Sequence, residues 1–94
     1  MKADQVLNDA IAVTADAWKD AAADGSIPLN INLRDRVMLF APRVRKLLFE
    51  LYPQLRAADD QVVLLVVAEG IARSGEVARK KLERELGIIL PPAG

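Results

Sequence analysis

Residues 60–73, with the sequence DQVVLLVVAEGIAR, decide the fold class of this chain, and every side chain in 62–68 is apolar. An apolar run this short suits a buried strand or a buried helix, and its periodicity alone does not distinguish the two. Two observations favour a helix. The stretch contains no internal turn signal, and only 27–33 and 88–90 offer partners for a strand. A helix that is apolar on all sides lies at the centre of its fold.

Two helices are predicted at the ends of the chain. Residues 3–23 carry apolar side chains at intervals of three and four, which is the spacing of a helix with one buried face. Gly25 follows directly and is a typical stop signal. A last helix is expected to begin at a Ser74 cap and to end at Leu86, before Gly87.

The second predicted helix covers 33–52, between an Asn32 cap and the helix-ending Pro53. Pro42 lies inside it. An interior proline removes one backbone hydrogen bond and clashes with the preceding turn, so the segment is either one kinked helix or two short ones. The expected core side chains of this segment are Leu33, Val37, Phe40, Val44, Leu47, Leu48 and Leu51.

The sequence therefore predicts an all-α fold, a compact bundle of four to five helices in one domain, 1–94. The alternative is an α+β fold with short strands near 27–33 and 62–67. It rests on the alternation of apolar side chains in the first of these segments and on the valines of the second. Pro28 argues against the first strand, because proline cannot donate to a strand ladder.

The composition excludes several classes of chemistry. The chain contains no cysteine and no histidine, which removes disulfides, thiolate zinc sites, cysteine nucleophiles and the most common general base. Its glycines match neither phosphate-binding loop motif. Asp59 and Asp60 are adjacent carboxylates, and we interpret them as a helix cap. We expect no catalytic residue, no metal site and no cofactor, and thus a protein that is not an enzyme.

The chain lacks the signals of a secreted or membrane protein. Acidic Asp4 and Asp9 stand where a signal peptide would carry positive charge and then an apolar run. The longest apolar run, 62–68, is far shorter than the ~20 residues that span a bilayer. We expect no membrane span and a cytoplasmic location.

Charge is segregated along a chain whose net charge is zero. Residues 1–33 carry a net charge of −3, whereas 34–56 carry +4. The basic segment makes nucleic-acid binding one candidate function, through the second helix or through the last two helices as a helix–turn–helix unit. The zero net charge and the acidic residues of the last helix count against it. The candidate nucleic-acid contacts are Arg34, Arg36, Arg43, Arg45 and Lys46.

The preferred function is a small non-enzymatic protein–protein interaction module, with self-association left open. Met38, Arg45, Phe49 and Tyr52 share a side of the second helix away from its core stripe, and this combination of residue types is typical of interface cores. The partner is then another protein or a second copy of the chain. The competing interpretation is that a kink at Pro42 returns Met38 to the core.

Three single residues carry structural expectations. Trp18 falls on the apolar stripe of the first helix and is expected in the core. Gly70 lacks a side chain in the central helix, which favours close approach of another helix. Glu69 has Arg73 four residues later, in the favourable order for an ion pair on a helix.

Overall fold

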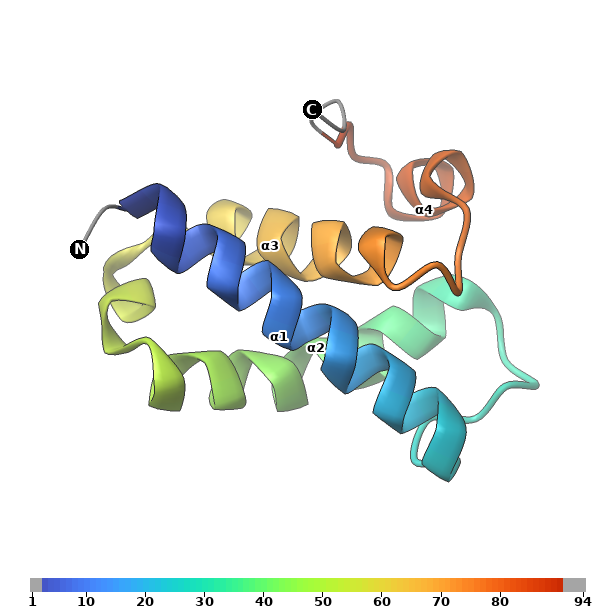
Figure 1. Ribbon diagram of the computed structural model, residues 1–94. Helices are drawn as coiled ribbons and strands as arrows, with labels where there is room; N and C mark the ends of the chain where they lie inside the picture. Colours follow the sequence, from blue (N-terminus) through green and yellow to red (C-terminus); the bar gives the residue numbers. More distant parts are fainter. Residues whose placement is uncertain (1–2, 91–94) are drawn as a thin grey trace.

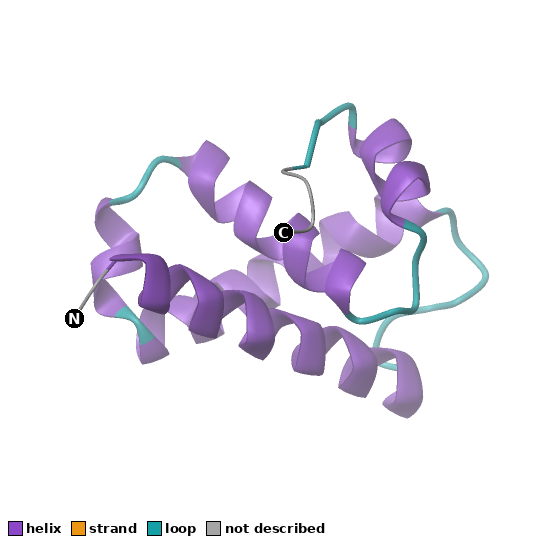
Figure 2. Ribbon diagram, turned by 45° about the horizontal axis from the view of Figure 1, so that its top comes forward, coloured by secondary structure: helices purple, strands orange, loops and turns teal. Residues whose placement is uncertain are grey.

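A computed structural model describes residues 3–90 of the chain, which contain four α-helices, one 3₁₀-helix and no strand (Figures 1 and 2). The all-α prediction is confirmed. The α+β alternative is wrong, because 62–67 are helical and 27–32 form an irregular loop. The elements in chain order are α1 (Ala3–Asp24), α2 (Leu33–Leu51), η1 (Pro53–Ala57), α3 (Asp60–Arg73) and α4 (Arg79–Leu86).

The helices pack around α3. α1 lies along α3 and crosses α2, while α4 follows a turn at the far end of α3 and points in another direction (Figure 1). The radius of gyration is 12.5 Å, close to the ~12 Å expected of a compact chain of this length. One buried apolar cluster joins all the elements, and its largest members include Trp18, Ile27, Phe40, Leu48, Ile71 and Leu82.

Gly70 explains why α1 and α3 can lie so close together. A Cβ atom added at Gly70 would lie 2.5 Å from the Cβ and Cγ2 atoms of Thr14 and 3.0 Å from the carbonyl oxygen of Ile11. The Thr14 hydroxyl donates to the carbonyl of Ala10 at 2.8 Å, so its polar atom is satisfied although it is fully buried. The predicted role of Gly70 is confirmed.

Trp18 contributes the largest core side chain of α1, as predicted, with only 1% of its surface exposed. Its ring meets Phe40 of α2 edge to face, with 5.0 Å between the ring centroids. The guanidinium of Arg36 covers another part of the indole, also 5.0 Å from the ring centroid. These contacts fix the point at which α1 crosses α2.

α2 is one unbroken α-helix with Pro42 inside it, so the interpretation as two short helices is wrong. Its start is fixed by Asn32, whose side-chain oxygen accepts a hydrogen bond from the Asp35 N–H at 2.8 Å. The predicted core stripe is correct except at Leu47 and Leu51, which are 36% and 51% exposed. Leu51 is the last residue of α2, and α1 crosses this helix instead of running beside it (Figure 1).

The connection between α3 and α4 differs from the prediction. α4 begins at Arg79, and Ser74 instead ends α3, donating to the carbonyl of Ile71 at 2.6 Å and accepting from the Glu76 N–H at 3.2 Å. The chain cannot continue as a helix there, because Gly75 has a φ of +81°. After α4, Leu90 returns to the core whereas Ile89 remains exposed. The proline pair expected to end the structure lies outside the described residues.

The predicted cap of α3 is only partly realised. Asp59 occupies the position before the helix, and its backbone carbonyl accepts from the N–H groups of Val62 and Val63. Its side chain makes no capping hydrogen bond to the helix. Asp60 instead turns its carboxylate toward α2, where it meets Arg45.

Candidate binding groove between α2 and α3

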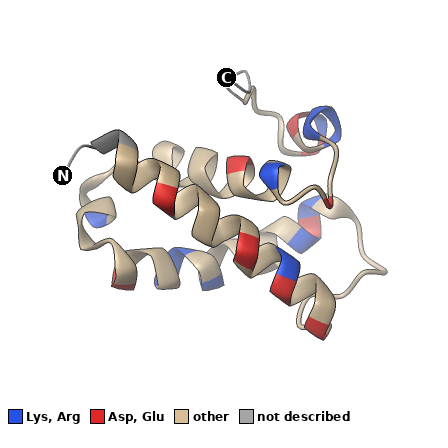
Figure 3. Ribbon diagram, in the orientation of Figure 1, with Lys and Arg blue, Asp and Glu red and all other residues tan. Residues whose placement is uncertain are grey.

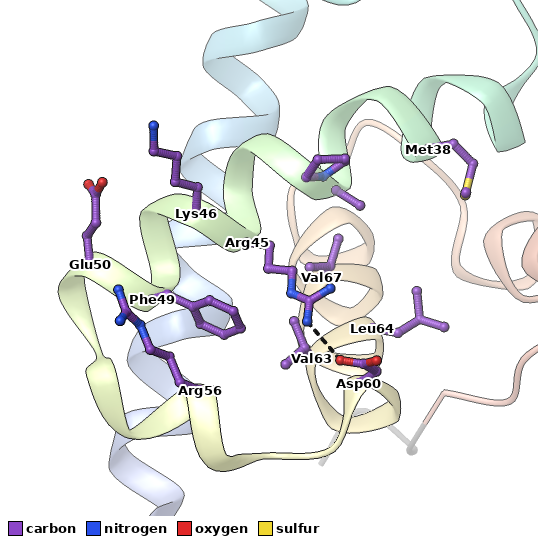
Figure 4. A pocket seen from close by; sticks show the side chains of 12 residues that line it. Met38, Arg45, Lys46, Phe49, Glu50, Arg56, Asp60, Val63, Leu64 and Val67 are labelled. Carbon is purple, nitrogen blue, oxygen red and sulfur yellow. Dashed lines mark hydrogen bonds and ion pairs between the residues drawn. The ribbon is translucent and has the colours of Figure 1, made fainter.

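An apolar groove of about 570 Å³ runs between α2 and α3 (Figure 4). This volume lies within the range of ~300–1,000 Å³ that is usual for ligand sites. Its charged residues are Arg45, Lys46, Glu50, Arg56 and Asp60. Its apolar lining consists of Met38, Ala41, Pro42, Phe49, Val63, Leu64 and Val67.

Three of the four predicted interface residues, Met38, Arg45 and Phe49, lie along this groove. Met38 is 63% exposed, so the interpretation that a kink at Pro42 returns it to the core is wrong. Tyr52 is half-buried at the end of α2 and packs against the core instead of lining the groove. The structure thus brings three of these residues together and leaves the fourth apart.

The α3 wall of the groove was not anticipated as a functional surface. Val63 and Val67 form its floor, and Leu64 is only half-buried at its edge. The sequence holds a signal for it. A helix that is apolar on all sides, in a chain this small, has more apolar surface than its neighbours can cover. This pattern does not indicate which helix lies opposite α3 across the groove.

Arg45 spans the groove from α2 to α3. Its Nη2 atom lies 2.8 Å from the Oδ1 atom of Asp60, and its guanidinium covers the Phe49 ring at 5.2 Å from the centroid (Figure 4). The side chains of Arg45 and Asp60 are 47% and 85% exposed. An ion pair this exposed contributes ~0–1 kcal/mol to stability, so its geometry is easily changed.

Three of the five charged lining residues gather at one end of the groove. Lys46, Glu50 and Arg56 stand around Phe49, whereas Met38 lies at the opposite end and Asp60 lies beside Leu64 (Figure 4). Among the described residues, none of these three charged side chains has a hydrogen-bond or ion-pair partner. The groove therefore has an apolar end and a charged end that is available to a partner.

The candidate nucleic-acid contacts do not form one patch. Arg45 and Lys46 belong to the groove, whereas Arg36 lies over Trp18. Arg43 lies on another side of α2, where it donates to the Ser26 carbonyl at 3.3 Å. There, hydrogen bonds from Ser26 and the nearby charge of Arg43 lower the pKa of Asp24 below its usual 3.8. Arg34 is exposed near the start of α2. Figure 3 shows basic residues on α2 and acidic ones along α1.

The last two helices form a connected unit of mixed charge. The buried Glu69 carboxylate of α3 accepts from Arg79 of α4 through two bonds, Nη2–Oε2 at 2.6 Å and Nη1–Oε1 at 3.1 Å. Arg73 completes the cluster at 3.0 Å, which confirms the predicted pair within α3. Arg79, the first residue of α4, is thus engaged within the protein.

Within residues 3–90, no three acidic, histidine or cysteine side chains come together in a way that could hold a metal ion. No helix in this part of the chain is long and apolar enough to cross a membrane.

Comparison of the chain with protein-family models, with curated proteins and with solved structures finds no match. The assignment of the groove therefore rests on its geometry and chemistry alone.

Proposed function

We propose that this protein is a non-enzymatic interaction module that binds a helix of a partner protein in the groove between α2 and α3. The observation that carries the proposal is the apolar groove itself, with Met38 exposed at one end and Phe49 at the other. A groove of this kind suits an amphipathic helix, whose apolar side chains recur along one face.

The dimensions of the groove favour a helical occupant. Met38 and Phe49 are three turns apart on α2, which is a distance of about 16 Å along its axis. An occupant helix of three to four turns would place apolar side chains at i, i+3, i+4 and i+7 along that length. On the α3 side the groove is lined by the buried Val63 and Val67 and by the half-buried Leu64, which is the most accessible of the three.

The charge distribution favours a protein over a nucleic acid as the partner. Nucleic-acid affinity depends on several cations that contact neighbouring phosphates together. Here Arg36, Arg43 and Arg45 lie in three different surroundings, and Arg45 is paired with a carboxylate. We also propose that the protein is located in the cytoplasm. A second copy of the chain is the competing occupant of the groove.

A matched pair of substitutions on α2 tests the proposal. Met38 and Leu51 are both more than half exposed, but only Met38 lines the groove. Tagged Met38→Glu and Leu51→Glu proteins are used to capture partners from the native cells, with and without nuclease. We expect the Met38→Glu protein to capture at least tenfold less partner than the wild type, because a carboxylate in an apolar contact is poorly solvated. The Leu51→Glu protein should capture as much partner as the wild type.

Three results would contradict the proposal. The partner could bind both variants equally, it could be released by nuclease, or sedimentation could show that wild-type protein dimerises and Met38→Glu does not. Phe49→Glu provides a second groove variant, with its fold checked by circular dichroism because Phe49 is half-buried.

A further inference from the structure

We infer that the partner helix is acidic and that one of its carboxylates takes the place of Asp60 on Arg45. This inference rests on the proposed function, since it specifies the chemistry of the occupant of the same groove. It is carried by the charged end of the groove and by the exposed ion pair that spans it.

The available charge at the groove is positive. Arg45 and Asp60 neutralise each other, and the remaining charged lining residues are Lys46, Arg56 and Glu50, with a net charge of +1. The whole segment 34–56 carries +4. An acidic helix would approach this surface faster and bind it more tightly than a basic helix, which the same field repels.

A second copy of this chain does not fit the groove equally well. The acidic helix of the chain is α1, but its apolar side chains are already buried against α3, and its exposed face carries Asp9, Asp16 and Asp20. The helix that does expose apolar side chains is α2, which is basic and would meet like charge. The acidic and apolar faces that the groove requires are not combined on one helix here.

The Arg45–Asp60 pair provides the recognition contact. The Arg45 guanidinium rests on the Phe49 ring and presents its donors across the groove opening, where Asp60 occupies them in the free protein. The pair is exposed, so exchanging one carboxylate for another has little effect on folding. A partner carboxylate that arrives with its own apolar anchors would compete successfully with Asp60, whose side chain is 85% exposed.

Designed peptides test the inference. Each is an amphipathic helix of about 14 residues with leucines at i, i+3, i+4 and i+7. Three versions differ only at two flanking positions, which hold Glu, Gln or Lys. Binding of labelled peptide is followed by fluorescence anisotropy at low and high salt, and the contact site is mapped by amide chemical-shift changes.

We expect the Glu peptide to bind about tenfold more tightly than the Lys peptide at low salt, with shift changes along the groove. Asp60→Asn, which removes the competing carboxylate, should tighten binding of the Glu peptide about threefold and leave the Gln peptide unchanged. Asp59→Asn is the matched control. It removes the same charge at the neighbouring position, and the Asp59 side chain does not line the groove. Arg45→Gln should weaken only the Glu peptide.

The outcomes separate the two proposals. If the Gln and Lys peptides bind in the groove as tightly as the Glu peptide, or if Asp60→Asn and Asp59→Asn behave alike, the acidic partner is wrong while the groove function remains. If none of the three peptides binds in the groove, both proposals fail. Retention of DNA or RNA that competes with the Glu peptide would also overturn the inference in favour of a nucleic-acid partner.

Discussion

At the scale of single residues, Gly70 stands out among the glycines that the structure describes, because it alone has atoms within 4 Å of the place where a Cβ would lie. Alanine favours helix over glycine by ~1 kcal/mol, so Gly70→Ala would stabilise an isolated helix. In the folded protein the new methyl group would overlap Thr14 and approach the Ile11 carbonyl. We expect the overlap to dominate and the free energy of unfolding to fall by about 1–3 kcal/mol, measured by urea denaturation.

A second substitution distinguishes this overlap from a general loss of helix stability. Thr14→Gly removes the atoms nearest to the added methyl group, so Gly70→Ala should be less damaging in the Thr14→Gly background than in the wild type. Simple additivity of the two changes would show that α1 and α3 do not meet as described.

At the scale of the element, α2 contains an interior proline, Pro42, and remains one continuous helix. Pro42 has no N–H, so the carbonyl of Met38 receives no helical hydrogen bond from it. Pro42 is exposed and lies outside the buried stripe of α2, so its ring does not disturb the core. The capping bond from Asn32 and the buried stripe through Leu48 hold the helix together on both sides of the proline.

Replacement of this proline should stabilise the element. Pro42→Ala restores the donor and removes the clash, and we expect the free energy of unfolding to rise by about 1–3 kcal/mol. Thermal denaturation followed by circular dichroism measures the change. Lys46→Ala, at an exposed position one turn later, is the control and should shift stability by less than about 0.5 kcal/mol. A fall in the free energy of unfolding on Pro42→Ala would mean that the proline itself is required for packing.

At the scale of the whole molecule, we expect local stability to be highest in the α1–α3 pair and lowest in α4. Helix α4 has eight residues, of which Leu82 is fully buried. The cluster of Glu69 with Arg79 and Arg73 also joins α4 to α3, and Leu86 packs against the core. A short helix with few buried side chains opens locally before the core unfolds.

Hydrogen exchange checks this ordering. We expect the amides of α4 to exchange well before those in the centre of α3, and Glu69→Gln to speed exchange in α4 further, because the substitution weakens the bonds to Arg79. Glu76→Gln makes the same charge change at an exposed position and should leave α4 as in the wild type. Equal protection of α3 and α4 would contradict this view of the fold.

The sequence by itself determined the local structure of the protein. The periodicity of apolar residues, the cap at Asn32 and the glycines at 25 and 87 set the helices to within a few residues, since these signals act between neighbours along the chain. The apolar run 62–68 correctly marked the central helix. The side of α2 that carries Met38, Arg45 and Phe49 could also be derived, because helical geometry fixes which residues share a side.

Only the tertiary structure decided what each face meets. Leu51 belongs to the same stripe as the buried Leu48, yet it is exposed because α1 crosses α2 instead of running beside it. The opposite wall of the groove and the Arg45–Asp60 pair depend on how α2 lies against α3. The bonds that Arg79 donates to Glu69 depend on how α4 lies against α3. These arrangements follow from the packing of all the helices together, including the close approach of α1 and α3 at Thr14 and Gly70.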